Sequence, residues 1–147
     1  MVGPMPMLNA GFLNRWRRLD RVRRALLFRA VWWLSVAFAA IALLPFKRAI
    51  RLGCVDRRGT KGVAPGDLAG AIETASRHLP WRTMCIERGI AAQRMLRAQG
   101  FDAVLHYGVS RPALSGDLQA HVWVTVDGRA VIGGEQAADF AEVAAYP

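Results

Sequence analysis

Two residues in the second half of the chain combine a nucleophile with a base. Cys85 opens a predicted helix over about 84–99, and His121 opens a predicted strand over 120–126. The unpaired N–H groups and partial positive charge at a helix start favour a thiolate over a thiol. A nearby imidazole can act as general base or ion-pair partner and later protonate a leaving amine. We therefore expect cysteine-based acyl chemistry if the two side chains meet.

A structural interpretation of the same residues competes with the catalytic one. A free cysteine is most often a small buried hydrophobe, and a histidine on a strand can simply be satisfied by its neighbours. Cys85 shortly follows Arg82 and stands at a helix start, which favours function. Two other histidines compete for the role of base. His78 lies near a helix end and is expected to bind terminal carbonyls, whereas His106 lies mid-strand with a parity that could face the helix.

A third group should orient the imidazole. Asp127 sits at a hairpin tip, and six strand residues at ~3.3 Å each place it about 20 Å from His121. With a two-residue turn at Asp127-Gly128, the ladder brings His121 opposite Gly134. Glu135 is then the nearest carboxylate and is the predicted orienter. Gln136, a backbone carbonyl or a water are the alternatives.

An oxyanion hole requires N–H donors aimed at the developing negative charge. The backbone N–H of Cys85 is the expected first donor. The second donor comes from the segment before the helix, or from a side chain such as Arg82 or Gln119. Trp123, two residues after His121, is a further candidate for contact with the substrate.

The elements around these residues predict an α+β fold, in which a Cys-bearing helix packs on a small antiparallel sheet. Strand 120–126 alternates between a face with His121 and a valine face. Asp127-Gly128 is a strong hairpin signal. Gly89 is small enough for the helix to lie tightly on the sheet. The expected elements are helices over 68–78 (capped by Asp67) and 84–99, strands over 103–109, 120–126 and 129–132, and a short helix over 135–145.

The first third of the chain is basic and then apolar. Residues 12–51 have a helical pattern, and Arg29 and Lys47 enclose 17 residues without charge, fewer than the ~20 apolar residues of a typical membrane span. We favour a packed helix, with a membrane-inserted or interfacial helix as the alternative. The predicted division is a segment 1–52 that docks a partner or membrane, a linker 53–66 and a catalytic core 67–147.

Charge and cysteine content narrow the function further. The formal net charge is +9, and residues 15–29 hold seven arginines against Asp20 alone. Such a segment suits an anionic membrane surface, an acidic protein or a nucleic acid. We expect no nucleic acid, because no binding motif follows the basic run. Two cysteines without metal-ligand spacing predict a reduced, cytoplasmic protein without a disulfide framework, a metal or another cofactor.

Residues 79–140 resemble the transglutaminase-like leader peptidases of lasso-peptide biosynthesis. In some of these systems the B protein is split into two chains, and this chain resembles the stand-alone protease half. The shared pattern is a Cys opening a helix, a Leu-Arg-x-x-Gly helix end, a strand with Gly-Val, and His-Ala-Trp-Val on a strand that ends in Asp-Gly. The matching residues are Cys85, Leu96-Arg97 with Gly100, Gly108-Val109 and His121-Val122-Trp123-Val124. The apolar, arginine-rich segment before them also looks like that family.

The resemblance implies a cysteine protease with a transglutaminase/papain-like core that cuts the leader from a ribosomally made precursor peptide. Its implied partners are that leader, a small winged-helix recognition protein acting in trans, and a separate ATP-dependent cyclase. Some members carry Asp about 12 residues after the histidine, where this chain has Gly133, so either Glu135 substitutes or the triad is a dyad. The alternative functions are transglutaminase or amidase-type acyl transfer, and a non-catalytic membrane-associated adaptor.

Overall fold

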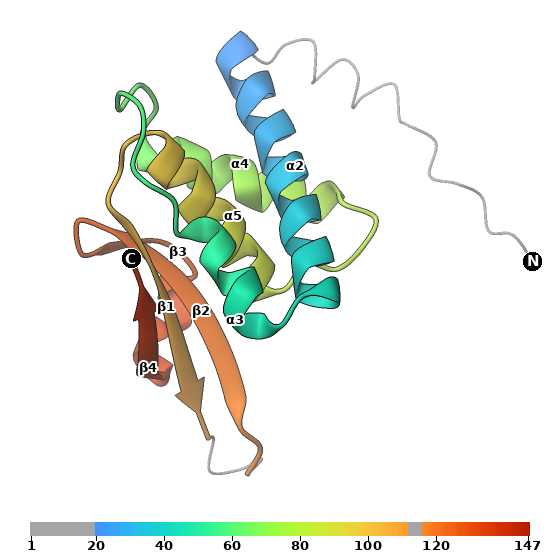
Figure 1. Cartoon of the computed structure of the whole chain (residues 1–147), viewed down its shortest axis with the longest axis vertical. Coiled ribbons are helices and arrows are strands. Elements are labelled where there is room, and N and C mark those ends of the chain that lie inside the picture. Colours follow the sequence, from blue (N-terminus) through green and yellow to red (C-terminus); the bar gives the residue numbers. More distant parts are fainter. Residues whose placement is uncertain (1–19, 112–115) are drawn as a thin grey trace, which may run out of the picture.

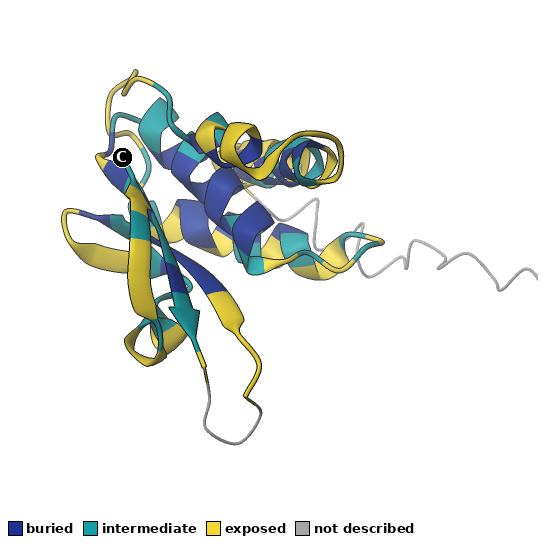
Figure 2. Cartoon of the chain, turned by 60° about the horizontal axis from the view of Figure 1, so that its bottom comes forward, coloured by how far each residue is buried: buried dark blue, intermediate teal, exposed yellow. Residues whose placement is uncertain are grey.

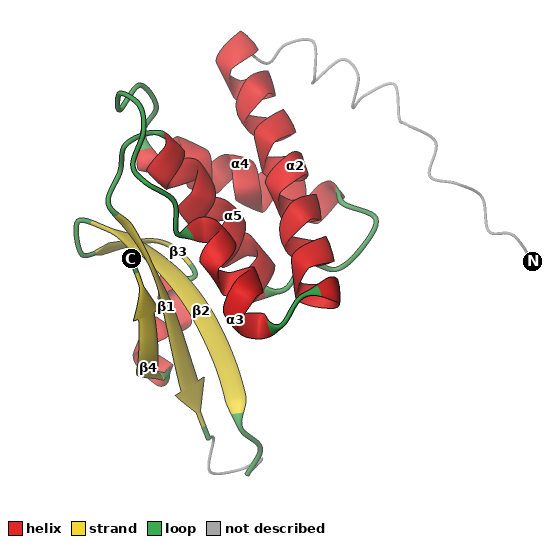
Figure 3. Cartoon of the chain, viewed as in Figure 1, coloured by secondary structure: helices red, strands yellow, loops and turns green. Residues whose placement is uncertain are grey.

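A layer of helices lies against one face of a four-stranded antiparallel sheet (Figure 1). The computed structural model describes residues 20–111 and 116–147. The helices are α2 (Arg21–Leu43), α3 (Phe46–Ala49), α4 (Pro65–His78) and α5 (Cys85–Ala98), with 3₁₀ turns η1 (Ile50–Gly53) and η2 (Gly134–Asp139). The strands are β1 (Ala103–Ser110), β2 (Gln119–Val126), β3 (Arg129–Ile132) and β4 (Ala141–Tyr146). The α+β prediction is confirmed (Figure 3).

Helix α5 packs on β1 and β2 through small side chains. A Cβ built on Gly89 would lie 2.5 Å from Cγ1 of Val122 and 3.3 Å from Cδ1 of Leu105. Glycine therefore lets the helix backbone approach the sheet closely, as its place on the predicted helix face suggested. Figure 2 shows this central helix as largely buried between the other helices and the sheet. The helix ends at Ala98, and Gly100 follows with φ +85, as expected for a helix C-terminus.

The sheet has the order β3-β2-β1-β4. β2 and β3 are joined at Asp127-Gly128, and both residues have positive φ (50 and 76), which fits a type I′ turn and confirms the predicted hairpin. The ladder is not regular, because the register shifts between Val124 and Thr125. The predicted alignment of His121 with Gly134 is therefore wrong, since it assumed an unbroken ladder.

The C-terminal residues form a strand where a helix was expected. Residues 141–146 pair with β1 as β4, with Leu105 opposite Tyr146. The alanine-rich sequence favours a helix locally, but the unpaired edge of β1 offers backbone partners that override this weak preference. Of the short helix predicted over 135–145, the first part forms the 3₁₀ turn η2 (Gly134–Asp139), and the prediction is wrong from Ala141 onward for this reason. Helix α4 begins at Pro65, so Asp67 lies in its first turn and is not its N-cap.

Helix α2 packs on α4 and α5. One side of it is buried in the same core as those helices, through Leu26, Ala30, Leu34 and Ala37. Among the described residues, α2 is a helix long and apolar enough to cross a membrane, a property that some core helices of soluble proteins and signal sequences share. The opposite side of α2 is exposed, as the yellow and teal stretches of Figure 2 show.

Candidate active site

Cys85 is the first residue of α5, as predicted. The preceding Met84 has an extended backbone, and its N–H donates to the Glu87 carboxylate over 3.0 Å. This is the carboxylate half of a capping box, and it fixes where the helix begins. Glu87 is 2% exposed. The Cys85 N–H has no hydrogen-bond partner among the described residues, so it is available to a substrate oxyanion.

His121 lies near the start of β2 and is buried. Its Nε2 lies 2.7 Å from the carbonyl oxygen of Gly133. A carbonyl can only accept, so Nε2 must carry the proton, and Nδ1 of the neutral imidazole then keeps a lone pair. The ring is held between Trp123 and Phe140, with centroid distances of 6.2 and 5.1 Å. The imidazole is thus fixed in a tautomer that can accept a proton at Nδ1.

The group that orients His121 is a backbone carbonyl in place of the expected Glu135 carboxylate. Gly133 has φ +70, and a Cβ there would lie 2.6 Å from the Val122 carbonyl oxygen. The glycine therefore permits the close approach of β3 to β2 that brings its carbonyl to the imidazole. Glu135 makes no hydrogen bond to His121 in the described part of the chain, although both residues line one pocket.

The starts of α5 and β2 lie toward the same end of the molecule. Helix α5 is followed after four residues by β1, and the Gln93 side chain donates to the Ala103 carbonyl at the start of β1. The helix therefore runs antiparallel to β1 and in the same direction as β2 (Figure 1). Cys85 lies one helical turn, about 6 Å, before the Gly89–Val122 contact. Cys85 thus lies on the side of that contact on which β2 begins.

The His121 side chain does not point toward the helix that carries Cys85. Val122 points to α5, and because strand residues alternate, His121 points to the other face of the sheet. Within residues 20–111 and 116–147, no hydrogen bond joins the Cys85 thiol to the imidazole. The pairing of Cys85 with His121 therefore stays a prediction.

The imidazole can be reached from the helix side of the β3 edge. A pocket of about 540 Å³ is lined by His121, by residues of α4 and α5 and by the stretch 130–136. Arg88 of α5 lies in this pocket, bridged to Glu73 of α4 at 3.4 Å, and Arg77 lies beside them. The Arg88 Nε is buried and has no hydrogen-bond partner among the described residues. The pocket therefore brings the His121 imidazole together with side chains of both charge signs.

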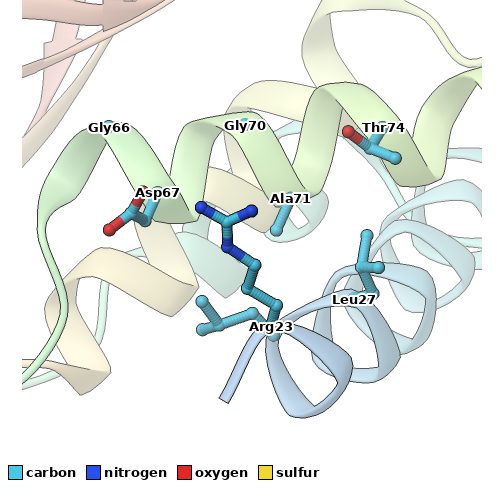
Figure 4. A pocket seen from close by; sticks show the side chains of 8 residues that line it. Arg23, Leu27, Gly66, Asp67, Gly70, Ala71 and Thr74 are labelled. Carbon is cyan, nitrogen blue, oxygen red and sulfur yellow. The ribbon is translucent and has the colours of Figure 1, made fainter. Parts of the chain in front are cut away.

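A second depression lies between the first turns of α2 and α4 (Figure 4). Its volume is about 280 Å³, and Arg23 and Asp67 line it beside the open backbone of Gly66 and Gly70. None of the candidate catalytic residues belongs to it. The described residues also contain no group of three or more His, Cys, Asp or Glu side chains placed to hold a metal ion.

His106 lies on the outer face of the sheet, so the idea that it could face the helix is wrong. Its Nδ1 lies 2.8 Å from Glu142 and its Nε2 lies 2.8 Å from the Thr125 hydroxyl. Its ring is stacked on Trp123 at 5.4 Å. Both ring nitrogens are therefore engaged away from α5. His78 lies 2.8 Å from the Thr74 carbonyl at the end of α4, as expected for a helix-end histidine.

The other candidates occupy different settings. Trp123 is buried between His106 and His121, where it supports the imidazole. Arg82 and Gln119 are exposed, in the loop before α5 and at the start of β2. Sequence reasoning missed Trp81, whose indole N–H is buried without a partner among the described residues. Only its place four residues before Cys85 could have indicated it.

The second cysteine is in a different environment. Cys54 is half-buried after η1, and its thiol lies 4.0 Å from the side-chain oxygen of the buried Gln93. Burial raises the pKa of the Cys54 thiol above its ordinary value, and this outweighs the opposite effect of Arg97 and Arg51. Cys54 is thus a structural thiol, and Cys85 is the better nucleophile candidate.

Comparison with protein families found a match over most of the chain. Residues 30–145 match a family model described as Transglutaminase-like superfamily. The chain belongs to the transglutaminase-like superfamily. This superfamily includes cysteine proteases, and the transglutaminase-like match contains both Cys85 and His121. It also begins within α2, so most of that helix lies inside the matched region. Comparison with curated proteins and with solved structures found no match.

Proposed function

We propose that this transglutaminase-like protein is a cysteine peptidase that removes the leader from a lasso precursor peptide. The observation that carries the peptidase proposal is the hydrogen bond from His121 to the Gly133 carbonyl, because it leaves Nδ1 as a base. Cys85 at the start of α5 supplies the nucleophile. The choice of a lasso precursor rests on the resemblance of residues 79–140, and on no contact in the structure.

The proposed reaction has two steps. His121 Nδ1 takes the Cys85 proton, and the thiolate attacks the carbonyl at the leader–core junction. The C–N bond of the resulting tetrahedral species breaks, and the imidazolium protonates the departing amine. Water then attacks the thioester and gives its proton to Nδ1, which releases the leader as a carboxylic acid and restores the thiol. The core peptide leaves with the free amine that a cyclase requires.

Hydrogen-bond donors stabilise the negatively charged tetrahedral intermediate of this reaction. The unpaired Cys85 N–H is the proposed first oxyanion donor. The Trp81 indole N–H, or a side chain such as Arg82 or Gln119, is the proposed second. No thiol–imidazole hydrogen bond exists in the described residues, so in this proposal the start of α5 moves toward Nδ1 when substrate binds, while Nε2 keeps its hydrogen bond to Gly133.

Partners and location follow from the same proposal. The leader peptide, a winged-helix recognition protein in trans and an ATP-dependent cyclase are the proposed partners, and the cytoplasm is the proposed location. The pocket beside His121 carries both signs of charge, from Arg77, Arg88, Glu73 and Glu135, which suits polar side chains around a cleavage site. The wild-type chain should cut the precursor faster when the recognition protein is present.

The decisive experiment is cleavage of a synthetic precursor peptide, followed by mass spectrometry. Cys85→Ala should abolish cleavage, and His121→Ala should lower the rate about 10²- to 10⁴-fold. His106→Ala is the matched control, because this histidine is held by Glu142 and Thr125 on the outer face. It should keep most of the rate, as should Cys54→Ser.

Three results would count against the proposal. Undiminished cleavage by the Cys85→Ala protein would exclude this thiol as the nucleophile. An inert wild-type protein with its recognition partner, combined with a loss of stability in Cys85→Ala, would favour the adaptor. If an added primary amine becomes linked to the leader, the enzyme transfers acyl groups to amines, and the transglutaminase alternative is correct.

A further inference from the structure

The exposed side of α2 carries a strip of apolar side chains. Between Arg29 and Lys47 the sequence has no charged residue, yet Trp32 is 64% and Leu43 81% exposed. The polar residue within this stretch, Ser35, donates its hydroxyl to the Val31 carbonyl over 2.7 Å. The apolar strip consists of Val31, Trp32, Phe38, Leu43 and Leu44, and continues to Phe46 of α3.

Basic residues stand at both ends of the apolar strip. No Asp or Glu occurs from Arg21 to Val55, while seven cations do. They are Arg21, Arg23, Arg24 and Arg29 at one end, and Lys47, Arg48 and Arg51 at the other; all but the half-buried Arg24 are exposed. Apolar side chains between two groups of cations are complementary to the acyl and headgroup layers of an anionic membrane.

The opposite side of α2 limits how the helix can meet a bilayer. Leu34 and Ala30 are 0% exposed and belong to the core shared with α4 and α5. A helix that crossed the membrane would have to leave this core, and its uncharged stretch of 17 residues is short for a span. A helix lying in the membrane plane keeps the core and buries only the exposed strip.

We propose that the apolar strip of α2 rests in the plane of an anionic lipid surface, with the flanking cations among the headgroups. In Figures 1 and 2, α5 lies between α2 and the sheet, so the bound protein turns its sheet away from the lipid. The β3 edge beside His121 then stays open to a peptide arriving from the aqueous side. This surface contact does not depend on the reaction at Cys85.

Flotation of the full chain with lipid vesicles tests the proposal. The protein should float with vesicles of phosphatidylcholine and phosphatidylserine, and much less with phosphatidylcholine alone. Added salt should weaken this binding, since it screens the cations. The double variant Trp32→Gln/Leu43→Gln should bind about tenfold or more weakly, because two large apolar side chains no longer enter the interface.

A matched control uses exposed hydrophobes outside the strip. Leu118 and Val143 are 64% and 57% exposed, before β2 and in β4. The Leu118→Gln/Val143→Gln protein should float as the wild type does. Circular dichroism should show that both double variants keep the helical content of the wild type.

Three outcomes would overturn the proposal. The first is equal flotation of the wild type and the Trp32→Gln/Leu43→Gln protein. The second is failure to bind anionic vesicles, and sedimentation would then show whether the strip joins two copies of the chain. The third is resistance to extraction by alkaline carbonate, which would mean that α2 crosses the bilayer. Binding is measured without substrate, so its result is independent of cleavage.

Discussion

A neutral carbonyl holds the imidazole of His121, and this choice has chemical consequences. A carboxylate would strengthen its hydrogen bond when the imidazole becomes charged, because charge-assisted bonds are roughly twice as strong as neutral ones. The Gly133 carbonyl fixes the ring and its tautomer but adds less to the stability of an imidazolium. In the proposed reaction, geometry therefore prepares His121 as a base more than charge does.

The identity of the orienting group can be tested at Glu135. Glu135→Gln should lower the cleavage rate by less than about tenfold, below the effect of losing a general base, because Gly133 holds the ring. Gly133→Ala should cost far more, since its Cβ would lie 2.6 Å from the Val122 carbonyl oxygen. Steady-state cleavage rates measure both. A large loss in Glu135→Gln would return the role of orienter to the carboxylate.

The two thiols should differ in reactivity. Burial raises the pKa of Cys54 above its ordinary value of 9.0, so near neutral pH this group remains a protonated, slow thiol. A raised pKa means that its thiolate fraction is very small near neutral pH, so its reaction with iodoacetamide should keep accelerating until the pH passes the pKa. Peptide mapping after brief labelling at neutral pH should therefore find the label on Cys85. Predominant labelling of Cys54 would contradict this, and Cys54→Ser and Cys85→Ser provide the reference spectra.

Several side chains could be placed from the sequence and others could not. Cys85 and His121 stand at the starts of an element, and hydrophobic periodicity locates such starts. The Gly133 carbonyl is a backbone group, so side-chain type does not reveal it, and the shift in register between β2 and β3 moved it from its expected position. Gln93 is buried and polar, and only its partners in space explain it, whereas the partner of the buried Glu87 is the N–H of the nearby Met84.

At the scale of elements, the packing of α5 on β2 at Gly89 determines the position of Cys85 relative to the sheet. Gly89→Ala should push the helix away from the sheet, because its Cβ would lie 2.5 Å from Cγ1 of Val122. Overpacking of this kind typically costs 1–3 kcal/mol. We expect a loss of about 1–3 kcal/mol in urea unfolding and a fall in cleavage rate.

A second substitution separates the steric effect from other causes. Val122→Ala removes the methyl groups that the new Cβ would meet. The Gly89→Ala/Val122→Ala protein should therefore be at least as active as Gly89→Ala alone, with positive coupling between the two changes. Strict additivity in stability and in rate would show that the helix–sheet contact is not responsible.

The elements also show where local sequence signals succeed. The type I′ turn and α5 carry strong local signals, namely Asp127-Gly128 and a terminal glycine, and both formed as expected. β4 did not follow its local preference, because its structure depends on a partner strand distant in sequence.

At the scale of the whole molecule, Gln93 joins parts of the chain that are far apart. Its side-chain nitrogen donates to the carbonyls of Ala103 and Tyr146 over 3.3 and 2.6 Å, and its oxygen faces the Cys54 thiol. The residue is fully buried in α5. One amide therefore satisfies polar atoms of β1, β4 and the segment after η1, and ties the helical layer to the sheet.

Loss of this amide should be costly. Gln93→Leu removes the side-chain donor to the Tyr146 carbonyl, whereas the Ala103 carbonyl keeps Arg97 as a donor at 3.3 Å. We expect a loss of about 1–3 kcal/mol in urea unfolding, the cost of one unsatisfied buried group. Gln136→Leu is the matched control, because this glutamine is exposed and the chemical change is the same. Equal midpoints for the two variants would show that the Gln93 network contributes little.

The sheet order β3-β2-β1-β4 also bears on the order in which the strands dock during folding and open afterwards. β1, β2 and β3 are neighbours both along the chain and in the sheet. β4 also pairs with β1, although β2 and β3 lie between these two strands in the sequence. Because its partner is distant in sequence, we expect the edge strand β4 to dock late and to open more readily than the central pair of β1 and β2. Its amides should therefore exchange with deuterium before those that β1 shares with β2. Phe140, which lies against the His121 ring, directly precedes β4. Each detachment of this edge should therefore remove the Phe140 contact, so that a ring already open to the pocket at the β3 edge gains a second exposed side.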